Sequence, residues 1–135
     1  MKTKTVSQLK KECWVLFSKY IRLRDCLKTT GCASFGLCVT CSRKFDFKQL
    51  QAGHFISRQK TNTLFDDKNV HAQCAGCNNY GGATMILNYR RAIINMYGDK
   101  YDEEIEKRSR VLKKFTIPEL LELKIELKKK IKGLE

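Results

Sequence analysis

The chain has 135 residues, a length that suits one compact domain with helical extensions, so we treat residues 1–135 as a single domain. Its formal net charge is +13, from 27 lysines and arginines against 14 aspartates and glutamates. A charge excess of this size favours a polyanionic partner, and we expect nucleic acid rather than a membrane surface. No apolar run approaches the roughly 18 residues of a membrane span, and the first residues are not typical of a signal peptide, so we expect a cytoplasmic protein.

The first predicted element is a helix over residues 5–28. Apolar residues recur there at alternating steps of three and four, which is the spacing of one face of an α-helix. They include Val6, Leu9, Cys13, Leu16, Tyr20, Leu23 and Leu27, and Trp14, Phe17 and Ile21 widen the stripe. A stripe this wide requires a partner helix, which either this chain or a second copy of it can supply.

A loop is expected over residues 29–37, and two Cys-x-x-Cys pairs follow. Seven cysteines are an odd number for a disulfide framework, and this paired spacing in a reducing compartment indicates metal ligands. Four thiolates form a closed tetrahedral shell, which is typical of structural zinc. The four predicted Zn²⁺ ligands are Cys38, Cys41, Cys74 and Cys77. Of the other cysteines, Cys13 and Cys26 are expected to be small buried residues, and Cys32 is a weaker alternative ligand.

The interval between the two cysteine pairs spans 32 residues, which is longer than in most DNA-reading zinc fingers and can hold a β-hairpin. Residues 42–50 predict a short irregular strand or turn. Residues 51–58 and 69–73 predict the two strands of the hairpin, with a polar turn over 59–68. A helix can begin just beyond the second pair. This order predicts a ββα-metal layout, in which the hairpin carries a general base and the helix start carries a metal ligand.

Two residues of this interval are candidates for chemistry. His54 is the candidate general base because an imidazole titrates near neutral pH, although a purely structural histidine is the alternative. Asn78 is the candidate ligand of a catalytic Mg²⁺ or Mn²⁺, because its amide oxygen is a hard donor. A helix N-cap is the alternative role for that asparagine. Asn69 is expected to pin the hairpin loop, while His71 stays open among a second metal ligand, a phosphate contact and a packed strand residue.

Three helices are predicted after the second cysteine pair. The first covers about 84–97, with Gly98 as its stop, and the second covers about 102–114. The third begins at Thr116, where Thr116-x-x-Glu119 predicts a capping box. It carries an apolar stripe backed by lysines, which together with basic residues of the first helix are expected to contact DNA phosphates without reading sequence. The basic residues assigned to DNA are Lys19, Arg22, Arg24, Arg58, Lys128, Lys129 and Lys130.

The segment from Cys38 to Asn78 resembles the HNH/endonuclease VII superfamily of ββα-metal nucleases. More narrowly, the chain resembles the lambdoid phage recombination endonuclease family called Rap or NinG. The resemblance is carried by Trp14 to Asp25, Cys38-Val-Thr-Cys41, Gln51-Ala-Gly-His-Phe55, Ser57-Arg58, Asn69-Val-His-Ala-Gln-Cys74 and Cys77-Asn78. It implies an α+β, mainly helical fold: a zinc-braced, treble-clef-like core over 38–97, with a long N-terminal helix and C-terminal helices over 102–135.

The resemblance also implies a function: metal-dependent cleavage of branched DNA such as Holliday junctions and D-loops, in the host bacterial cytoplasm if the chain is phage-encoded. His54 and Asn78 would then lie at the catalytic metal, with His54 activating water to leave a 5′-phosphate and a 3′-hydroxyl. Two opposed cuts in a four-way junction favour a homodimer. Gly53 departs from the superfamily pattern, because many HNH enzymes carry a metal-binding aspartate there, and Asn78 replaces the final HNH histidine, as in the endonuclease VII branch. The replacements considered for the aspartate are His71, Asp66, Asp67 and Asp46, and the alternative is a metal held loosely through water and phosphate.

Three other functions stay open at this point. A zinc-containing DNA-binding accessory module would bind DNA without cutting it, and the missing carboxylate at Gly53 favours it. A sequence-specific HNH nuclease would require a DNA-reading domain, for which 135 residues leave little room. A zinc-braced protein-interaction domain would leave the charge of +13 unexplained.

Overall fold

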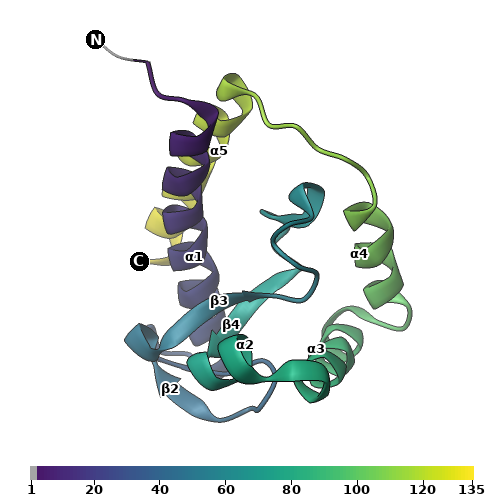
Figure 1. Ribbon diagram of the computed structural model, residues 1–135. Coiled ribbons are helices and arrows are strands. Elements are labelled where there is room, and N and C mark those ends of the chain that lie inside the picture. The colour runs from purple at the N-terminus through teal and green to yellow at the C-terminus, as the bar shows by residue number, and fades with distance from the viewer. Residues whose placement is uncertain (1–2) are drawn as a thin grey trace.

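A computed structural model describes residues 3–135 of the chain (Figure 1). The first helix, α1 (Val6–Thr30), begins at Thr5, whose side chain accepts a hydrogen bond from the backbone of Gln8 while the Gln8 side chain accepts one from the backbone of Thr5. This reciprocal pair satisfies two backbone donors that a helix start leaves free. The helix ends at Gly31, which adopts the left-handed conformation (φ 74°) that favours glycine. The predicted range of 5–28 is therefore correct to within two residues.

The last helix, α5 (Ile117–Leu134), packs along α1 in the same direction (Figure 1). Leu9 and Cys13 near the start of α1 contact Leu120 near the start of α5, and Phe17 further along contacts Leu127. The partner helix that the wide stripe of α1 requires is thus supplied by this chain. Burying one leucine in such a contact stabilises the fold by about 2 to 3 kcal/mol.

Two antiparallel strand pairs lie beside α1. The strands β1 (Phe35–Leu37) and β2 (Lys44–Asp46) form one pair, and β3 (Leu50–His54) and β4 (Val70–Cys74) form the other. The predicted hairpin strands correspond to β3 and β4, whereas β1 lies where the sequence predicted a loop. Between β2 and β3 the chain makes the 3₁₀ turn η1 (Phe47–Gln49), and the turn η2 (Thr61–Thr63) lies in the long loop between β3 and β4.

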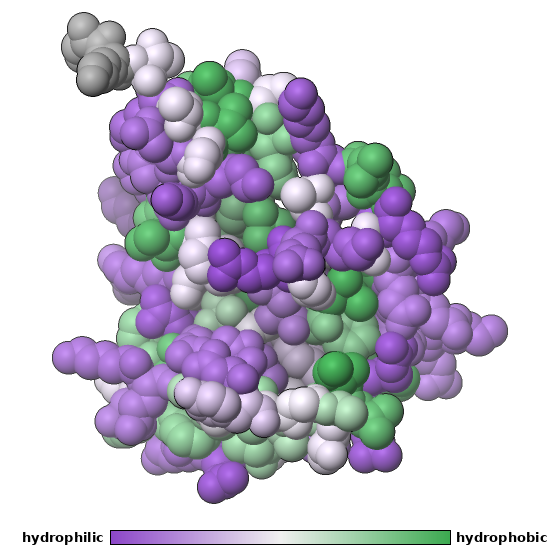
Figure 2. Space-filling view, viewed as in Figure 1, coloured by the Kyte–Doolittle hydropathy of each residue, from purple (hydrophilic) through white to green (hydrophobic). Residues whose placement is uncertain are grey.

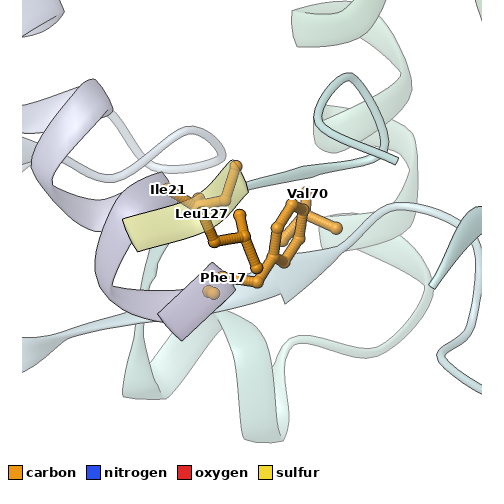
Figure 3. Packing of buried hydrophobic residues seen from close by; sticks show 5 residues of the cluster. Phe17, Ile21, Val70 and Leu127 are labelled. Carbon is orange, nitrogen blue, oxygen red and sulfur yellow. The ribbon is translucent and has the colours of Figure 1, made fainter. Parts of the chain in front are cut away.

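One face of the β3–β4 pair packs on α1 and α5. Phe17 and Ile21 of α1, Val70 of β4 and Leu127 of α5 converge there, as Figure 3 shows. Polar contacts reinforce this packing. Asp25 accepts a hydrogen bond from the backbone of Ala72 at 2.7 Å.

The other face of the β3–β4 pair is covered by helices that follow the second cysteine pair. A short helix, α2 (Ala75–Tyr80), leads directly into α3 (Gly82–Tyr97), which was predicted to begin two residues later. The helix α4 (Tyr101–Ser109) ends earlier than the predicted residue 114, and an extended segment then returns to α5 (Figure 1). Tyr89 and Ile93 of α3, Ile105 of α4 and Phe55 form the apolar cluster on this side.

Helix α5 begins at Thr116, whose side chain accepts a hydrogen bond from the backbone of Glu119. The Glu119 carboxylate instead forms an ion pair with Lys113 at 2.7 Å, so only one half of the predicted capping box is present. Among residues 3–135, no helix combines the length and the apolar character needed to cross a membrane.

Candidate functional site

The two cysteine pairs meet at one point of the fold. Cys38 and Cys41 lie in the turn between β1 and β2, Cys74 ends β4, and Cys77 lies in the first turn of α2. Their four sulfur atoms all lie within 4.8 Å of one another, and the Sγ atoms of Cys41 and Cys74 are 4.0 Å apart. A tetrahedral ion with bonds of about 2.3 Å places its sulfur ligands about 3.8 Å apart. The cluster can therefore hold a metal ion such as zinc, while Cys32 is exposed and lies outside it.

The surroundings of these thiols already favour one thiolate. Burial alone would raise the pKa of Cys38, but hydrogen bonds from the Thr40 hydroxyl and from backbone N–H groups lower it to about 6. Burial raises the pKa of Cys77 to about 12. Four thiolates cannot form together without a cation, since each negative charge disfavours the next. A divalent ion would offset that repulsion and hold β1, β4 and α2 together.

His54 lies at the end of β3, half-buried against α1. Its ring stacks on Trp14, with ring centroids 5.0 Å apart and an angle of 17° between the planes. Its Nε2 atom lies 3.1 Å from the carbonyl oxygen of Leu64. Because a carbonyl only accepts hydrogen bonds, Nε2 must carry the proton, and the neutral ring then has Nδ1 as its basic atom. Among residues 3–135, His54 forms no second ring hydrogen bond, so this nitrogen is available as a base.

Burial lowers the pKa of His54 from its ordinary value of 6.5, and the charge of Arg58 lowers it further, although the Leu64 carbonyl opposes both effects. The imidazole is therefore neutral at pH 7, which is the form that accepts a proton. Asn78 of α2 lines the same cavity, whose volume is about 620 Å³. The Nδ2 group of Asn78 donates to Gln51 Oε1 at 2.8 Å, so the Asn78 oxygen faces away from Gln51. The predicted base and the predicted metal ligand thus share one cavity beside the cysteine cluster.

The basic residues assigned to DNA fall into three groups in the structure. Arg22 and Arg58 line the cavity that contains His54. Arg24 instead points inward, where it pairs with Asp25 and donates to the carbonyl oxygens of Asp67 and Val70. We therefore assign Arg24 a structural role in place of the predicted DNA contact. The remaining lysines are exposed and outside the cavity lining: Lys19, Lys128, Lys129 and Lys130.

His71 and Asn69 are both buried in the hairpin. The ring nitrogens of His71 lie 3.2 Å and 2.7 Å from the hydroxyls of Tyr89 and Tyr97, and burial lowers its pKa to about 4. Of the three roles left open for His71, this geometry favours a packed strand residue, since no ring nitrogen stays free for a metal. The Asn69 side chain accepts from Ile56 N–H and donates to the carbonyls of Ile56 and Thr63, which are the bonds that pinning the loop requires.

The sequence profile of a family described as "Bacteriophage Lambda NinG protein" matches residues 1–135. The chain belongs to the NinG family. It is 30% identical over 98 residues to Protein ninG of Escherichia phage 933W, covering 72% of this chain and 47% of that protein. It is also 30% identical over 116 residues to Protein ninG of Enterobacteria phage H19B, covering 85% of this chain and 52% of that protein. The chain therefore spans about half the length of these curated relatives. No solved structure matches it.

The cavity of this NinG-family chain also contains residues that sequence reasoning did not single out. Trp14 was assigned to a core stripe, yet it stacks on His54 and lines the cavity. Gln51 orients Asn78, and Gln73 lines a smaller recess of about 210 Å³ together with His54 and Asn78. The one available signal was their alternation with apolar residues in the two strands, which places Gln51 and Gln73 on the same face of the hairpin.

None of the four residues considered as a replacement for the missing aspartate lines the His54 cavity or its recess. Asp66 forms an ion pair with Arg108 at 2.8 Å, and Asp46 is exposed at the end of β2. The Asp67 side chain is half-buried elsewhere, and both ring nitrogens of His71 are occupied. Among the described residues, no carboxylate lines this cavity.

Proposed function

We propose that this NinG-family protein is a metal-dependent DNA endonuclease that cuts branched recombination intermediates, such as Holliday junctions and D-loops, in the cytoplasm of the host bacterium. The observation that carries the proposal is the position of His54. Its ring is neutral, is held in one tautomer by the Leu64 carbonyl, and lines the same cavity as Asn78 beside the cysteine cluster. This arrangement is what a general base next to a metal ligand in a ββα-metal nuclease requires.

In the proposed mechanism, Nδ1 of His54 accepts a proton from the water that attacks the scissile phosphorus, and the bond from phosphorus to the 3′-oxygen breaks. The leaving 3′-oxygen takes a proton from solvent water, which gives a 5′-phosphate and a 3′-hydroxyl. The Leu64 carbonyl stabilises the resulting imidazolium, because it already accepts from Nε2–H. The guanidinium groups of Arg22 and Arg58 lie on the cavity wall, where they bind non-bridging phosphate oxygens. A Mg²⁺ or Mn²⁺ ion bound in part by the Asn78 oxygen would supply Lewis-acid stabilisation of the developing charge.

A basic path along α1 supports DNA as the substrate. A second hollow adjoins the His54 cavity on the other side of Trp14, and Lys10, Lys11 and Arg58 line it. In Figure 2 hydrophilic side chains are spread over the visible face, with apolar patches between them. Contacts of this type bind phosphate groups irrespective of base sequence, which suits recognition of DNA by shape.

Branched DNA and a homodimer are the parts of the proposal that rest on the resemblance. Two symmetric cuts require two active sites, and two-fold symmetric dimers provide such a pair at fixed spacing. The side of α5 that faces away from α1 exposes Leu121 and Ile125, at 46% and 58% of their surfaces, and this side is available to a second copy.

The test compares a four-way junction with a linear duplex of the same arms, in Mg²⁺ or Mn²⁺. We expect the unaltered protein to cut the junction and His54→Ala to cut at least about 100-fold more slowly while still binding it. Asn78→Ala should also lose cutting, whereas Asn95→Ala, at an exposed position of α3, should not. The cutting rate should rise with pH and then level off, with its midpoint below the ordinary histidine pKa of 6.5, because only the neutral His54 accepts a proton.

A non-catalytic DNA-binding module is the second candidate, and the absence of a carboxylate among the residues that line the cavity favours it. That function predicts junction binding without cutting in either metal. Equal cutting of the linear duplex at one defined sequence would instead support a sequence-specific nuclease. Full junction cutting by His54→Ala would exclude the mechanism given above.

A further inference from the structure

We propose that Gln73 supplies a ligand oxygen to the catalytic metal, in place of the aspartate side chain that position 53 lacks. This inference rests on the proposed function for the role of the metal, but its geometric basis is independent of any cleavage. Gln73 is 97% buried, yet its side chain lines the recess that also contains His54 and Asn78.

The first argument is the space beside Gly53. A Cβ atom added to Gly53 would overlap the Gln73 Oε1 atom, and its next contacts would be Gln73 Cδ at 2.8 Å and Asn78 Oδ1 at 3.0 Å. The oxygen of Gln73 thus occupies the volume into which a side chain at position 53 would project. The carboxamide of Gln73 on β4 therefore takes the place of a side chain at position 53 on β3.

The second argument is the orientation of the Gln73 amide. Its Nε2 lies 3.2 Å from the Thr40 hydroxyl, which lies 3.3 Å from the Cys38 sulfur. Nε2 of Gln73 donates to the Thr40 hydroxyl oxygen, which can accept this bond whichever way its own proton points. The bond fixes the NH₂ group of Gln73 toward Thr40 and turns its oxygen toward Gly53.

The third argument is that two amide oxygens converge on one point. Asn78 donates its NH₂ group to Gln51, so its Oδ1 also faces Gly53. Apart from Gly53 and its two chain neighbours, the atoms nearest to that point are Oε1 and Cδ of Gln73 and Oδ1 of Asn78. Two amide oxygens directed to one point provide a site for a cation.

The two ligand groups, the side-chain amides of Gln73 and Asn78, are neutral, so the affinity of the site for a cation is low. Mg²⁺ and Mn²⁺ are usually held by one or two carboxylates together with substrate phosphates, and here no aspartate or glutamate of the described residues lines the cavity or its recess. The free protein should therefore bind the ion weakly, and a DNA phosphate should complete the site. The same reasoning predicts that a carboxylate placed at this point will raise the affinity without DNA.

The test measures Mn²⁺ binding to the zinc-loaded full chain by electron paramagnetic resonance, which reports free Mn²⁺ and requires no cleavage. Gln73→Glu keeps the shape and adds a charge, and it should tighten Mn²⁺ binding by about tenfold. Gln73→Met keeps the volume and removes the oxygen, and it should weaken binding by about tenfold. The double variant Gly53→Asp/Gln73→Ala moves a carboxylate into the vacated space and should bind at least as tightly as the unaltered protein.

The control is Gln59→Glu, which adds the same charge at an exposed glutamine outside the cavity lining. If Gln73→Glu binds Mn²⁺ no better than this control, the proposal is wrong, and this holds even where Gln73→Met fails to fold. The inference is also wrong if a folded Gln73→Met retains full affinity. If Mn²⁺ binding depends on Gln73 but the protein cuts no junction, the nuclease function is excluded. The role of Gln73 as a metal ligand would still stand.

Discussion

The two histidines of the β3–β4 pair have opposite environments. His54 lies opposite Val70 and His71 lies opposite Gly53, so the two residues are neighbours in the pair, yet their rings point to opposite faces. On the α1 side, His54 uses one nitrogen to fix its tautomer and leaves the other at a cavity. On the α3 side, His71 has both nitrogens beside tyrosine hydroxyls. The same side chain therefore keeps one ring nitrogen free on one face and has both nitrogens beside hydroxyl groups on the other.

The largest effect that we expect follows removal of the metal, which should abolish the difference in environment between His54 and His71. Chelation should lower the free energy of unfolding by on the order of 10 kcal/mol, because the binding free energy of a structural four-thiolate metal is part of the folding free energy, and Cys77→Ser should lower it in the same direction. Zinc content and thermal melting by circular dichroism would measure it. Cys32→Ser should melt as the unaltered protein does, since Cys32 is exposed and outside the cluster. An unchanged melting temperature after complete chelation would contradict a structural metal.

A smaller effect is expected for His71, the histidine with a structural role, and it concerns how stability depends on pH. Its pKa is about 4 in the folded protein and about 6.5 in the unfolded chain, so the folded state resists protonation. Its contribution to stability is complete above pH 6.5 and is lost as the pH falls toward 4, by up to about 3 kcal/mol. In urea unfolding, the difference in stability between the unaltered protein and His71→Gln should shrink over that range. A constant difference would contradict this role.

The smallest expected effect concerns the face of the β3–β4 pair on which the His54 cavity lies. Arg58→Gln at the cavity should reduce the slope of log K against log[salt] for DNA binding by about one unit, the value for one lost phosphate contact. In the same assay, Lys128→Gln tests the prediction that the exposed lysines of α5 contact DNA phosphates. A reduced slope for Lys128→Gln alone would place the DNA on α5 and away from His54.

The sequence predicted those parts of the fold that depend on local patterns. The stripe of α1, the helix start at Thr116 and the spacing within each cysteine pair are local patterns, so they can be recognised without knowing what they contact. The strand β1 escaped prediction because three residues, Phe35 to Leu37, are too few to show alternation. Helix α4 ended early for a tertiary reason, since Thr61 of the long loop bonds to Lys113 in the returning segment.

The candidate site was predictable only in part, for a related reason. His54 and Asn78 could be found because each residue type suggests its chemistry and the cysteine pairs indicate their position. The environment of His71 depends on Tyr89 and Tyr97, which lie 18 and 26 positions further along the chain. The position of Gln73 depends on strand register, because only the pairing of Gly53 with His71 brings its oxygen to Gly53.

The parallel packing of α1 with α5 has a consequence for biosynthesis. Cys13 donates to the Leu120 carbonyl across 107 positions, and α1 leaves the ribosome before α5, so the core contacts of α1 are incomplete until α5 is made. The hairpin covers Phe17 and Ile21 earlier, whereas most of the residues that pack around Leu9 belong to α5 and the segment just before it. Contacts this distant slow folding, and a nascent chain carrying such a bare apolar segment is a natural client for a chaperone.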